Sequence, residues 1–300
     1  MSEENIRRLW PSWERDSLKI TELKGGIVNT SYVVKIDGEA YVVRVPGKNT
    51  ELYFDREIER ENMELLAKGG IAPELVEFRK DDKIIIREFI EGTVATKESF
   101  KDPDTRRKAI SAIRQLHESE IRLSNDFNVF VEIRRYRDLL RPYSDRVLAD
   151  YPVDRLCELT RSIEKELSKQ SEIRLACHND LLPANFILAD EGVRIIDWEY
   201  SGMNDPCYDI ANHIAELDNI DEEEEEHILG LYFGEEIDQK RVTVDLYKLP
   251  SRLLWGFWGL IQRNVSDMGF DFESWARHQL DQALHHAHML ETKYPHILAI

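Results

Sequence analysis

The stretch from Ile173 to Glu216 constrains the fold of this chain more than any other. An apolar strand (173–177) leads into a polar loop (178–185), and a short strand (186–189) and a second strand (193–196) follow. The second strand delivers Asp197, and a helix is predicted from about Pro206. The polar loop therefore connects two predicted strands. This position is compatible with a simple capped turn and with a functional loop.

Three residues of this loop have a spacing that is typical of phosphoryl transfer. His178, Asp180 and Asn185 form H-x-D-x-x-x-x-N, in which the aspartate orients a hydroxyl group and the asparagine holds Mg²⁺. Asp197 ends a strand, where the second metal-binding carboxylate of this chemistry belongs. Carboxylate and amide oxygens suit a hard cation. We therefore predict Asp180, Asn185 and Asp197 as catalytic residues, with Asn185 and Asp197 as the Mg²⁺ ligands.

The sequences IDWEY (196–200) and DIANHIAE (209–216) resemble the choline/ethanolamine kinase family, within the larger group that includes aminoglycoside phosphotransferases. The resemblance extends from about Ile20 to Leu290. It implies a two-lobed, protein-kinase-like α+β fold, with a small antiparallel-sheet N-lobe and a mainly helical C-lobe. We expect residues 1–90 to form the nucleotide-binding lobe and residues 91–300 to form the catalytic and substrate-binding lobe.

The first lobe begins with a β pattern. Strands are predicted at 18–23, 30–36 and 39–45, the last two joined by a two-residue Asp-Gly turn. The glycine-containing turn at 24–30 is by itself compatible with an ordinary hairpin. The kinase-like order instead places it over the phosphates of ATP, with the candidate nucleotide-binding residues Gly25, Gly26 and Asn29.

A basic residue on the third strand matches the position of the β3 lysine of protein kinases. This residue, Arg44, could be a solvated strand arginine, but the resemblance implies a phosphate contact, and a guanidinium can grip phosphate oxygens through two hydrogen bonds. The helix at 54–69 should supply an acid that pairs with Arg44. Glu59 matches the family's spacing, while Glu57 and Glu61 are close competitors.

A second hairpin, with its turn at Asp81-Asp82, leads into the expected hinge between the lobes. Backbone groups of Glu88 and Ile90 would meet the adenine edge there. Apolar periodicity predicts helices at 103–119, 131–149, 153–171, 244–266 and 272–294. A short helix and a turn at Trp10-Pro11 are predicted within residues 1–16, and the six acids at 221–226 are interpreted as a solvated helix start.

The resemblance also assigns an acceptor pocket. It implies that an aromatic cage with an adjacent acid surrounds a trimethylammonium group, and the matching positions are Tyr200, Glu216, Trp255, Trp258 and Trp275. Tryptophans of this kind are more often core residues, and Trp275 stands where the family has a tyrosine. Cation–π contact with desolvated rings contributes roughly 2 kcal/mol or more.

Choline is therefore the expected acceptor, with ethanolamine, another amino-alcohol or a thiamine-like alcohol as rivals. An aminoglycoside would call for an open cleft of carboxylates, and an inactive pseudokinase would not need these catalytic residues. Two departures from related patterns stand out: Leu182 replaces a polar side chain, and Glu199 replaces the glycine of the protein-kinase Asp-Phe-Gly segment.

Composition adds weaker constraints. The formal charge of -18 argues against a nucleic-acid partner, which would require clustered Lys and Arg, and it suits a cationic small substrate. No apolar run approaches the length of a membrane span, and the N-terminal residues are too polar for a secretory signal. The three cysteines lack metal-ligand spacing, so we expect a reduced, cytoplasmic protein without membrane insertion. The oligomeric state is left open.

Overall fold

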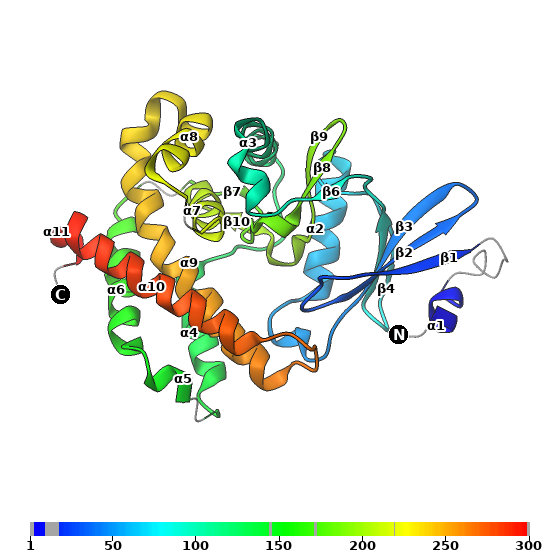
Figure 1. Cartoon of the computed structure of the whole chain (residues 1–300), viewed down its shortest axis with the longest axis horizontal. Helices are drawn as coiled ribbons and strands as arrows, with labels where there is room; N and C mark the ends of the chain where they lie inside the picture. The colour runs from blue at the N-terminus through cyan, green and yellow to red at the C-terminus, as the bar shows by residue number, and fades with distance from the viewer. Residues whose placement is uncertain (1–2, 10–17, 144–145, 171–172, 219, 299–300) are drawn as a thin grey trace.

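The structure, a computed structural model, describes residues 3–9, 18–143, 146–170, 173–218 and 220–298. A small sheet lies at one end of the long axis, and a larger helical part extends from it to α11 at the other end (Figure 1). The predicted two-lobed α+β architecture is therefore confirmed. The expected turn at Trp10-Pro11 lies outside the described residues.

The sheet of the first lobe is antiparallel and has the strand order β1-β2-β3-β5-β4. Its strands are β1 Lys19–Leu23, β2 Thr30–Ile36, β3 Glu39–Val45, β4 Leu75–Arg79 and β5 Ile84–Glu88. At the β2–β3 turn, Asp37 and Gly38 have φ of 51° and 89°. Both values are positive, as a two-residue hairpin turn of this type requires.

The register divides the sheet into two faces. Val43 and Ile86 point into a small core that also contains Ile6 of α1 (Glu3–Arg7). Because neighbouring residues of a strand alternate between faces, the opposite side carries the residues that flank these two in sequence. We call this side the Arg44 face, and it is formed by Val33, Val42, Arg44, Ile85 and Arg87.

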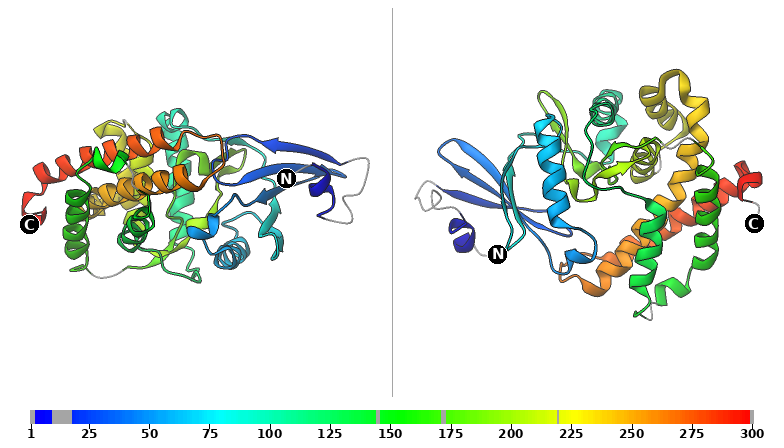
Figure 2. Two further views of the ribbon diagram at one scale, coloured as in Figure 1. Left: turned by 90° about the horizontal axis from the view of Figure 1, so that it is seen from below. Right: turned by 180° about the vertical axis from the view of Figure 1, so that it is seen from behind.

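Helix α2 (Arg56–Lys68) lies between the sheet and the helical lobe (Figures 1 and 2). Its first turn is capped by the carboxylate of Asp55, which accepts hydrogen bonds from the amides of Glu57 and Ile58 at 2.9 and 3.4 Å. It ends at Gly69, and Gly70 follows with a φ of 73°. A glycine in this conformation is a common way to end a helix.

The helical lobe packs around two long helices that run side by side, α9 and α10 (Figures 1 and 2). Its α-helices are α3 Pro103–His117, α4 Val129–Leu140, α5 Arg146–Ala149, α6 Val153–Leu167, α7 Pro206–Glu216, α8 Glu222–Phe233, α9 Ile237–Val265, α10 Phe272–Lys293 and α11 Pro295–Leu298. No helix in the described part of the chain is long and apolar enough to cross a membrane.

Two predicted helices differ from the structure. The predicted helix at 131–149 is wrong, because α4 ends at Leu140 and a separate α5 begins at Arg146. Pro142 lies between them, and a proline removes an amide donor and clashes with the preceding turn of a helix. Helix α9 starts at Ile237, seven residues before the predicted start at 244, because its first two turns are polar and lack the apolar run that marked the rest.

Short strands near the middle of the chain position the predicted catalytic loop. They are β6 Thr93–Val94, β7 Leu175–Cys177, β8 Phe186–Ala189, β9 Gly192–Ile195 and β10 Gly202–Asn204. Strand β10, which the sequence did not predict, pairs with β7. At Gly202 a side chain would collide with the Asn125 amide, since a Cβ there would lie 2.8 Å from its Nδ2.

Candidate active site

The loop after β7 is held in place by one buried carboxylate of α7. The backbone amides of His178 and Asn179 donate hydrogen bonds to Asp209 at 2.8 and 2.7 Å. The same carboxylate lies 3.0 Å from His117 Nε2. Asp209 was not predicted as a site residue, because a side chain that binds loop amides leaves no periodic pattern in the sequence. His117 is buried, as expected for a packing residue.

Asp180 follows this anchored pair of residues and lies among other acids. Burial raises the pKa of its carboxyl well above the ordinary value. The negative charges of Glu216, Asp197 and Glu199 act in the same direction. The structure therefore brings together three predicted site residues, Asp180, Asp197 and Glu216, with Glu199 as an additional acid.

Asn185 connects Asp180 to the segment before Asp197. Its side-chain Nδ2 donates to the Asp180 carbonyl at 2.8 Å and to the Asp180 carboxylate at 3.3 Å. Its backbone carbonyl accepts a hydrogen bond from Ile196 N at 2.9 Å. Because the amide nitrogen faces Asp180, the amide oxygen is directed elsewhere and can serve another partner.

Asp197 adopts a left-handed backbone conformation, with φ of 69°, at the start of the 3₁₀ turn η5 (Trp198–Tyr200). This conformation is uncommon for a residue with a side chain and often occurs at functional sites. The Asn185 amide oxygen and the Asp197 carboxylate are hard oxygen donors. They fit Mg²⁺, which prefers such ligands.

Arg44 bridges two of the predicted site residues, since its guanidinium donates to both Glu59 and Asp197. Burial lowers the pKa of Arg44, while Asp197 opposes the shift. The competing acids point elsewhere: Glu57 and Glu61 both pair with Arg60 at 3.3 Å. Of the three acids that the sequence left open, Glu59 is therefore the one that contacts Arg44.

A second arginine completes this charged cluster. Arg56 Nη1 lies 2.7 Å from Glu59 and 2.8 Å from Glu199, and Arg56 Nη2 donates to Asn29 Oδ1 at 3.1 Å. Asn29 Nδ2 donates to Glu199 at 3.0 Å. The side chain of Asn29 thus ties the glycine-containing loop to η5. Arg56 is buried and was not among the predicted site residues.

The remaining predicted nucleotide-binding residues lie on the loop and at the end of β5. Gly25 has a φ of 105°, and a Cβ at Gly26 would lie 2.4 Å from the Asn29 carbonyl, so a side chain at 26 would not fit. At the other end of the sheet, Glu88 N donates to Glu74 O at 2.9 Å. Ile90 lies two residues after Glu88 and is half-buried.

The predicted acceptor residues form a connected series of aromatic rings. Ring centroids are 4.9 Å apart for Tyr200 and Trp255, 6.0 Å for Trp255 and Trp258, and 6.3 Å for Trp258 and Trp275, each pair meeting edge to face. The indole N–H groups of the three tryptophans are buried and have no hydrogen-bond partner among the described residues.

Glu216 is buried and already has two neighbours. Gln279 Nε2 donates to its carboxylate at 3.3 Å, and Arg252 Nη1 lies 3.5 Å away. Arg252, which the sequence did not single out, also contacts Asp218. Although burial acts in the opposite direction, Arg252 and Lys97 hold the pKa of the Asp218 carboxyl below its ordinary value. The charge of Glu216 is therefore partly compensated by the protein itself.

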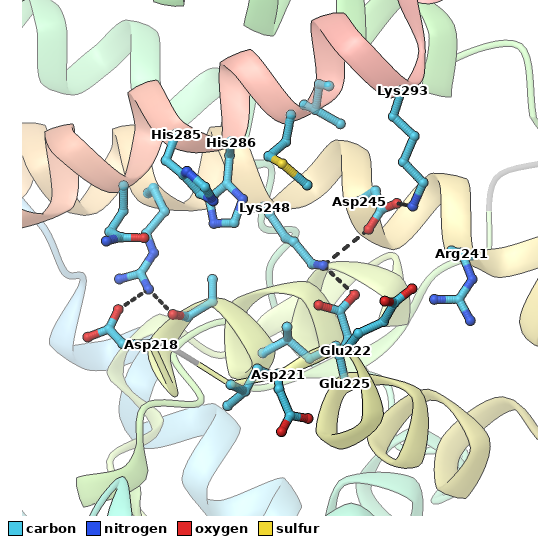
Figure 3. Close-up of a pocket in the computed structure, with 17 residues that line it drawn as sticks. Asp218, Asp221, Glu222, Glu225, Arg241, Asp245, Lys248, His285, His286 and Lys293 are labelled. Carbon is cyan, nitrogen blue, oxygen red and sulfur yellow. Dashed lines mark hydrogen bonds and ion pairs between the residues drawn. The ribbon is translucent and has the colours of Figure 1, made fainter.

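A separate polar pocket of about 500 Å³, with Asp218 in its lining, lies between α8, α9 and α10 (Figure 3). One of its two lysine ammonium groups, Lys248 Nζ, lies between the carboxylates of Glu225 and Asp245, 3.1 Å from the latter. None of the residues that the sequence predicted as site residues lines this pocket. The predicted site is instead the region around Asp180, Asp197 and the aromatic rings.

Comparison with known proteins identifies the family. A family model described as choline/ethanolamine kinase matches residues 20–231, more than half of the chain. The chain belongs to the choline/ethanolamine kinase family. This membership confirms the resemblance inferred from the IDWEY and DIANHIAE segments, and it makes the chain a kinase by family.

Three relatives illustrate the extent of the similarity. Choline kinase LicA from Streptococcus pneumoniae superposes with a TM-score of 0.81 and 27% identity, covering 96% of this chain and 99% of that one. Ethanolamine kinase 2 of Rattus norvegicus is 30% identical over 90% of this chain and 77% of its own length. An aminoglycoside 2'-phosphotransferase-IIIa shares the fold, with a TM-score of 0.66 at 17% identity, covering 95% of this chain and 96% of that one.

Proposed function

We propose that this chain transfers the γ-phosphoryl group of a nucleoside triphosphate to the hydroxyl group of choline. The family includes kinases of choline and of ethanolamine, so the choice of choline is our inference. The observation that carries it is the series of rings formed by Tyr200, Trp255 and Trp258, which belongs to the same predicted site as Glu216 and Asp180.

The polar groups around these rings favour a quaternary ammonium. Such a group has no N–H to donate and is held by aromatic faces, methyl packing and diffuse negative charge. A primary ammonium carries three N–H donors that need acceptors. Glu216 already interacts with Gln279 and Arg252, and the buried indole groups are themselves donors. The site is therefore rich in aromatic surface and poor in free acceptors.

The catalytic groups have separate roles in this proposal. Asp180 orients the acceptor hydroxyl and receives its proton, since it is hydrogen-bonded to the predicted metal ligand Asn185 and feels the charges of Glu216 and Asp197. Asn185 and Asp197 would hold Mg²⁺, which neutralises charge on the transferred phosphoryl group. Arg44, anchored by Glu59, would contact phosphate oxygens.

The donor nucleotide would bind across the Arg44 face of the sheet. The loop with Gly25, Gly26 and Asn29 would cover the phosphates, and backbone groups of Glu88 and Ile90 would meet the edge of the base. Residues 1–90 then act as the nucleotide-binding lobe, and residues 91–300 supply the catalytic and acceptor residues. The resemblance implies ATP as the donor, and the choice of purine base is considered below.

A panel of acceptors tests this function. Choline, ethanolamine and a thiamine-like alcohol are supplied with Mg²⁺ and either ATP or GTP, and the release of nucleoside diphosphate is measured. We expect choline to give the highest kcat/KM, by about tenfold over ethanolamine. A higher value for ethanolamine would assign the rival acceptor, and absence of turnover with every alcohol would contradict the kinase assignment.

A further inference from the structure

One half-buried arginine on the Arg44 face has no part in the charged cluster described above. Arg87 lies on β5 directly opposite Val42 of β3, on the strand next to Arg44. It immediately precedes Glu88, the first residue of the expected hinge. Its guanidinium contacts the Glu88 carbonyl, so it lies beside the backbone that is expected to meet the nucleotide base.

The partners of Arg87 differ from those of the other two arginines. Arg44 and Arg56 each contact carboxylates. Within the described residues, Arg87 has one close polar contact, a hydrogen bond from Nη1 to the backbone carbonyl of Glu88 at 3.2 Å. Burial lowers the pKa of Arg87 to about 10, and the positive charge of Arg44 adds to this effect. The guanidinium therefore remains charged at neutral pH.

This contact changes what the hinge offers to a base. An unoccupied Glu88 carbonyl would accept a hydrogen bond from the 6-amino group of adenine. Here Arg87 donates to that carbonyl and brings further N–H donors beside it, because a guanidinium has five donors and no acceptor. The 6-amino group of adenine, itself a donor, would face the N–H donors of Arg87.

A 6-oxopurine has the opposite polarity at this edge. Guanine carries acceptors at O6 and N7, and arginine recognises this pair through two hydrogen bonds in the most common specific contact to a base edge. We propose that Arg87 selects a 6-oxopurine nucleotide, GTP or ITP, over ATP as the phosphoryl donor. This inference rests on the proposed function, because it assumes that the base meets Glu88.

The alternative role for Arg87 is a phosphate contact. Arg87 lies on the strand next to Arg44, and the negative charge of Asp197 opposes the lowering of its pKa. A phosphate contact would favour every nucleoside triphosphate equally, because the phosphates of ATP, GTP and ITP are the same. Base selectivity therefore separates the two roles.

The first experiment measures binding of GDP, IDP and ADP, each with Mg²⁺, to the full chain by titration calorimetry without an acceptor. We expect GDP and IDP to bind about tenfold more tightly than ADP. IDP has O6 but lacks the 2-amino group of guanine, so equal affinity for GDP and IDP assigns the selectivity to O6. Tighter binding of ADP overturns the proposal.

The second experiment compares Arg87→Met with a matched control, Arg79→Met. Arg79 pairs with Ile84 on the opposite face of the same sheet and donates to the Leu9 carbonyl at 2.7 Å. Arg87→Met removes the donors and frees the Glu88 carbonyl, so GDP and IDP should bind about tenfold more weakly while ADP binds at least as well as before. Arg79→Met should keep the original order of affinities.

Two outcomes separate failure of this inference from failure of the proposed function. An equal loss for all three nucleotides in Arg87→Met would assign Arg87 to the phosphates and overturn base selection. Selective binding of GDP and IDP without turnover of any amino-alcohol would support base selection while contradicting the kinase assignment. If Arg87→Met does not fold, as judged by circular dichroism, the order of the three wild-type affinities decides.

Discussion

Asp180 is the residue on which the proposed chemistry depends most directly. It is linked to Asn185 by a 3.3 Å side-chain hydrogen bond, and Glu216 and Asp197 both influence its charge state. Asp180 is thus linked to a predicted metal ligand by a hydrogen bond and to the acid of the acceptor site through charge. It is the position from which one carboxylate could orient a hydroxyl group toward a phosphate.

Replacement of this carboxylate should therefore affect turnover more than binding. We expect Asp180→Asn to lower kcat by about 10²–10⁴, because general-base groups typically contribute that much. Nucleotide affinity should stay nearly unchanged in calorimetry. Asp197→Asn is the comparison, since loss of a metal ligand should also weaken Mg²⁺-dependent nucleotide binding. Near-native turnover of Asp180→Asn would remove this role.

The acceptor rings give a second residue-scale prediction. Trp258→Leu keeps apolar bulk in the core but removes the aromatic face, so it should raise KM for choline by about thirtyfold, the equivalent of roughly 2 kcal/mol. Ethanolamine should be affected much less, since its ammonium depends on acceptors rather than on rings. Glu216→Gln should weaken both substrates through loss of charge. Equal effects of Trp258→Leu on the two acceptors would mean that the rings are packing only.

At the scale of an element, α2 carries two glutamates that are two residues apart and lie in very different environments. Glu59 is buried between Arg44 and Arg56, whereas Glu57 pairs with Arg60 at the surface. Helix geometry turns these two side chains to different directions, because successive residues are separated by about 100°. The same helix therefore carries a buried ion pair and a solvated one.

This difference predicts unequal effects on stability. Glu59→Gln leaves two buried guanidinium groups short of a counter-charge, so the free energy of unfolding should fall by about 3–5 kcal/mol. Glu57→Gln breaks a partly solvent-exposed pair and should change the free energy of unfolding by less than about 1 kcal/mol. Urea denaturation of the two variants measures the contrast. Comparable losses would show that burial of the Arg44–Glu59 pair does not matter for folding.

At the scale of the whole molecule, Asn62 connects the two lobes. Although it lies on α2, its Nδ2 donates to Ser201 O at 3.1 Å and to Asn125 Oδ1 at 2.8 Å, and its Oδ1 accepts from Ser124 N at 2.9 Å. All three partners belong to the helical lobe, and Asn62 is fully buried. The helix next to the sheet is thereby fixed to the lobe that carries Asp197.

Removal of this link should weaken the packing of one lobe on the other. Asn62→Ala leaves the carbonyl of buried Ser201 without its Asn62 donor, and an unsatisfied buried polar group costs about 1–3 kcal/mol. We expect a loss of that size in the free energy of unfolding measured in urea. Glu61→Ala, at the neighbouring exposed position, is the control and should have little effect. A neutral result for Asn62→Ala would argue that the lobes are held together by other contacts.

The sequence by itself determined the elements whose signals are local. Strands β2 and β3 follow from apolar alternation and from the Asp37-Gly38 turn, because period-two patterns and turn residues act within a few positions. The spacing of Asp180 and Asn185 marked the catalytic loop for the same reason. Reliance on local signals also explains the two helices that were predicted with wrong bounds. The apolar pattern continues past Pro142, where the helix breaks, and the polar start of α9 has no apolar pattern to mark it.

Only the tertiary structure decided which charged groups share a site. Arg56 and Glu199 are 143 positions apart in the chain, yet they form an ion pair. Asn29 and Glu59 belong to the same cluster, because both contact Arg56. Arg252 reaches Glu216 in the same way. The energy of such contacts depends on distance and burial in space, which the order of residues along the chain does not specify. The choice of Glu59 over Glu57 was therefore open until the folded chain placed one of them beside Arg44.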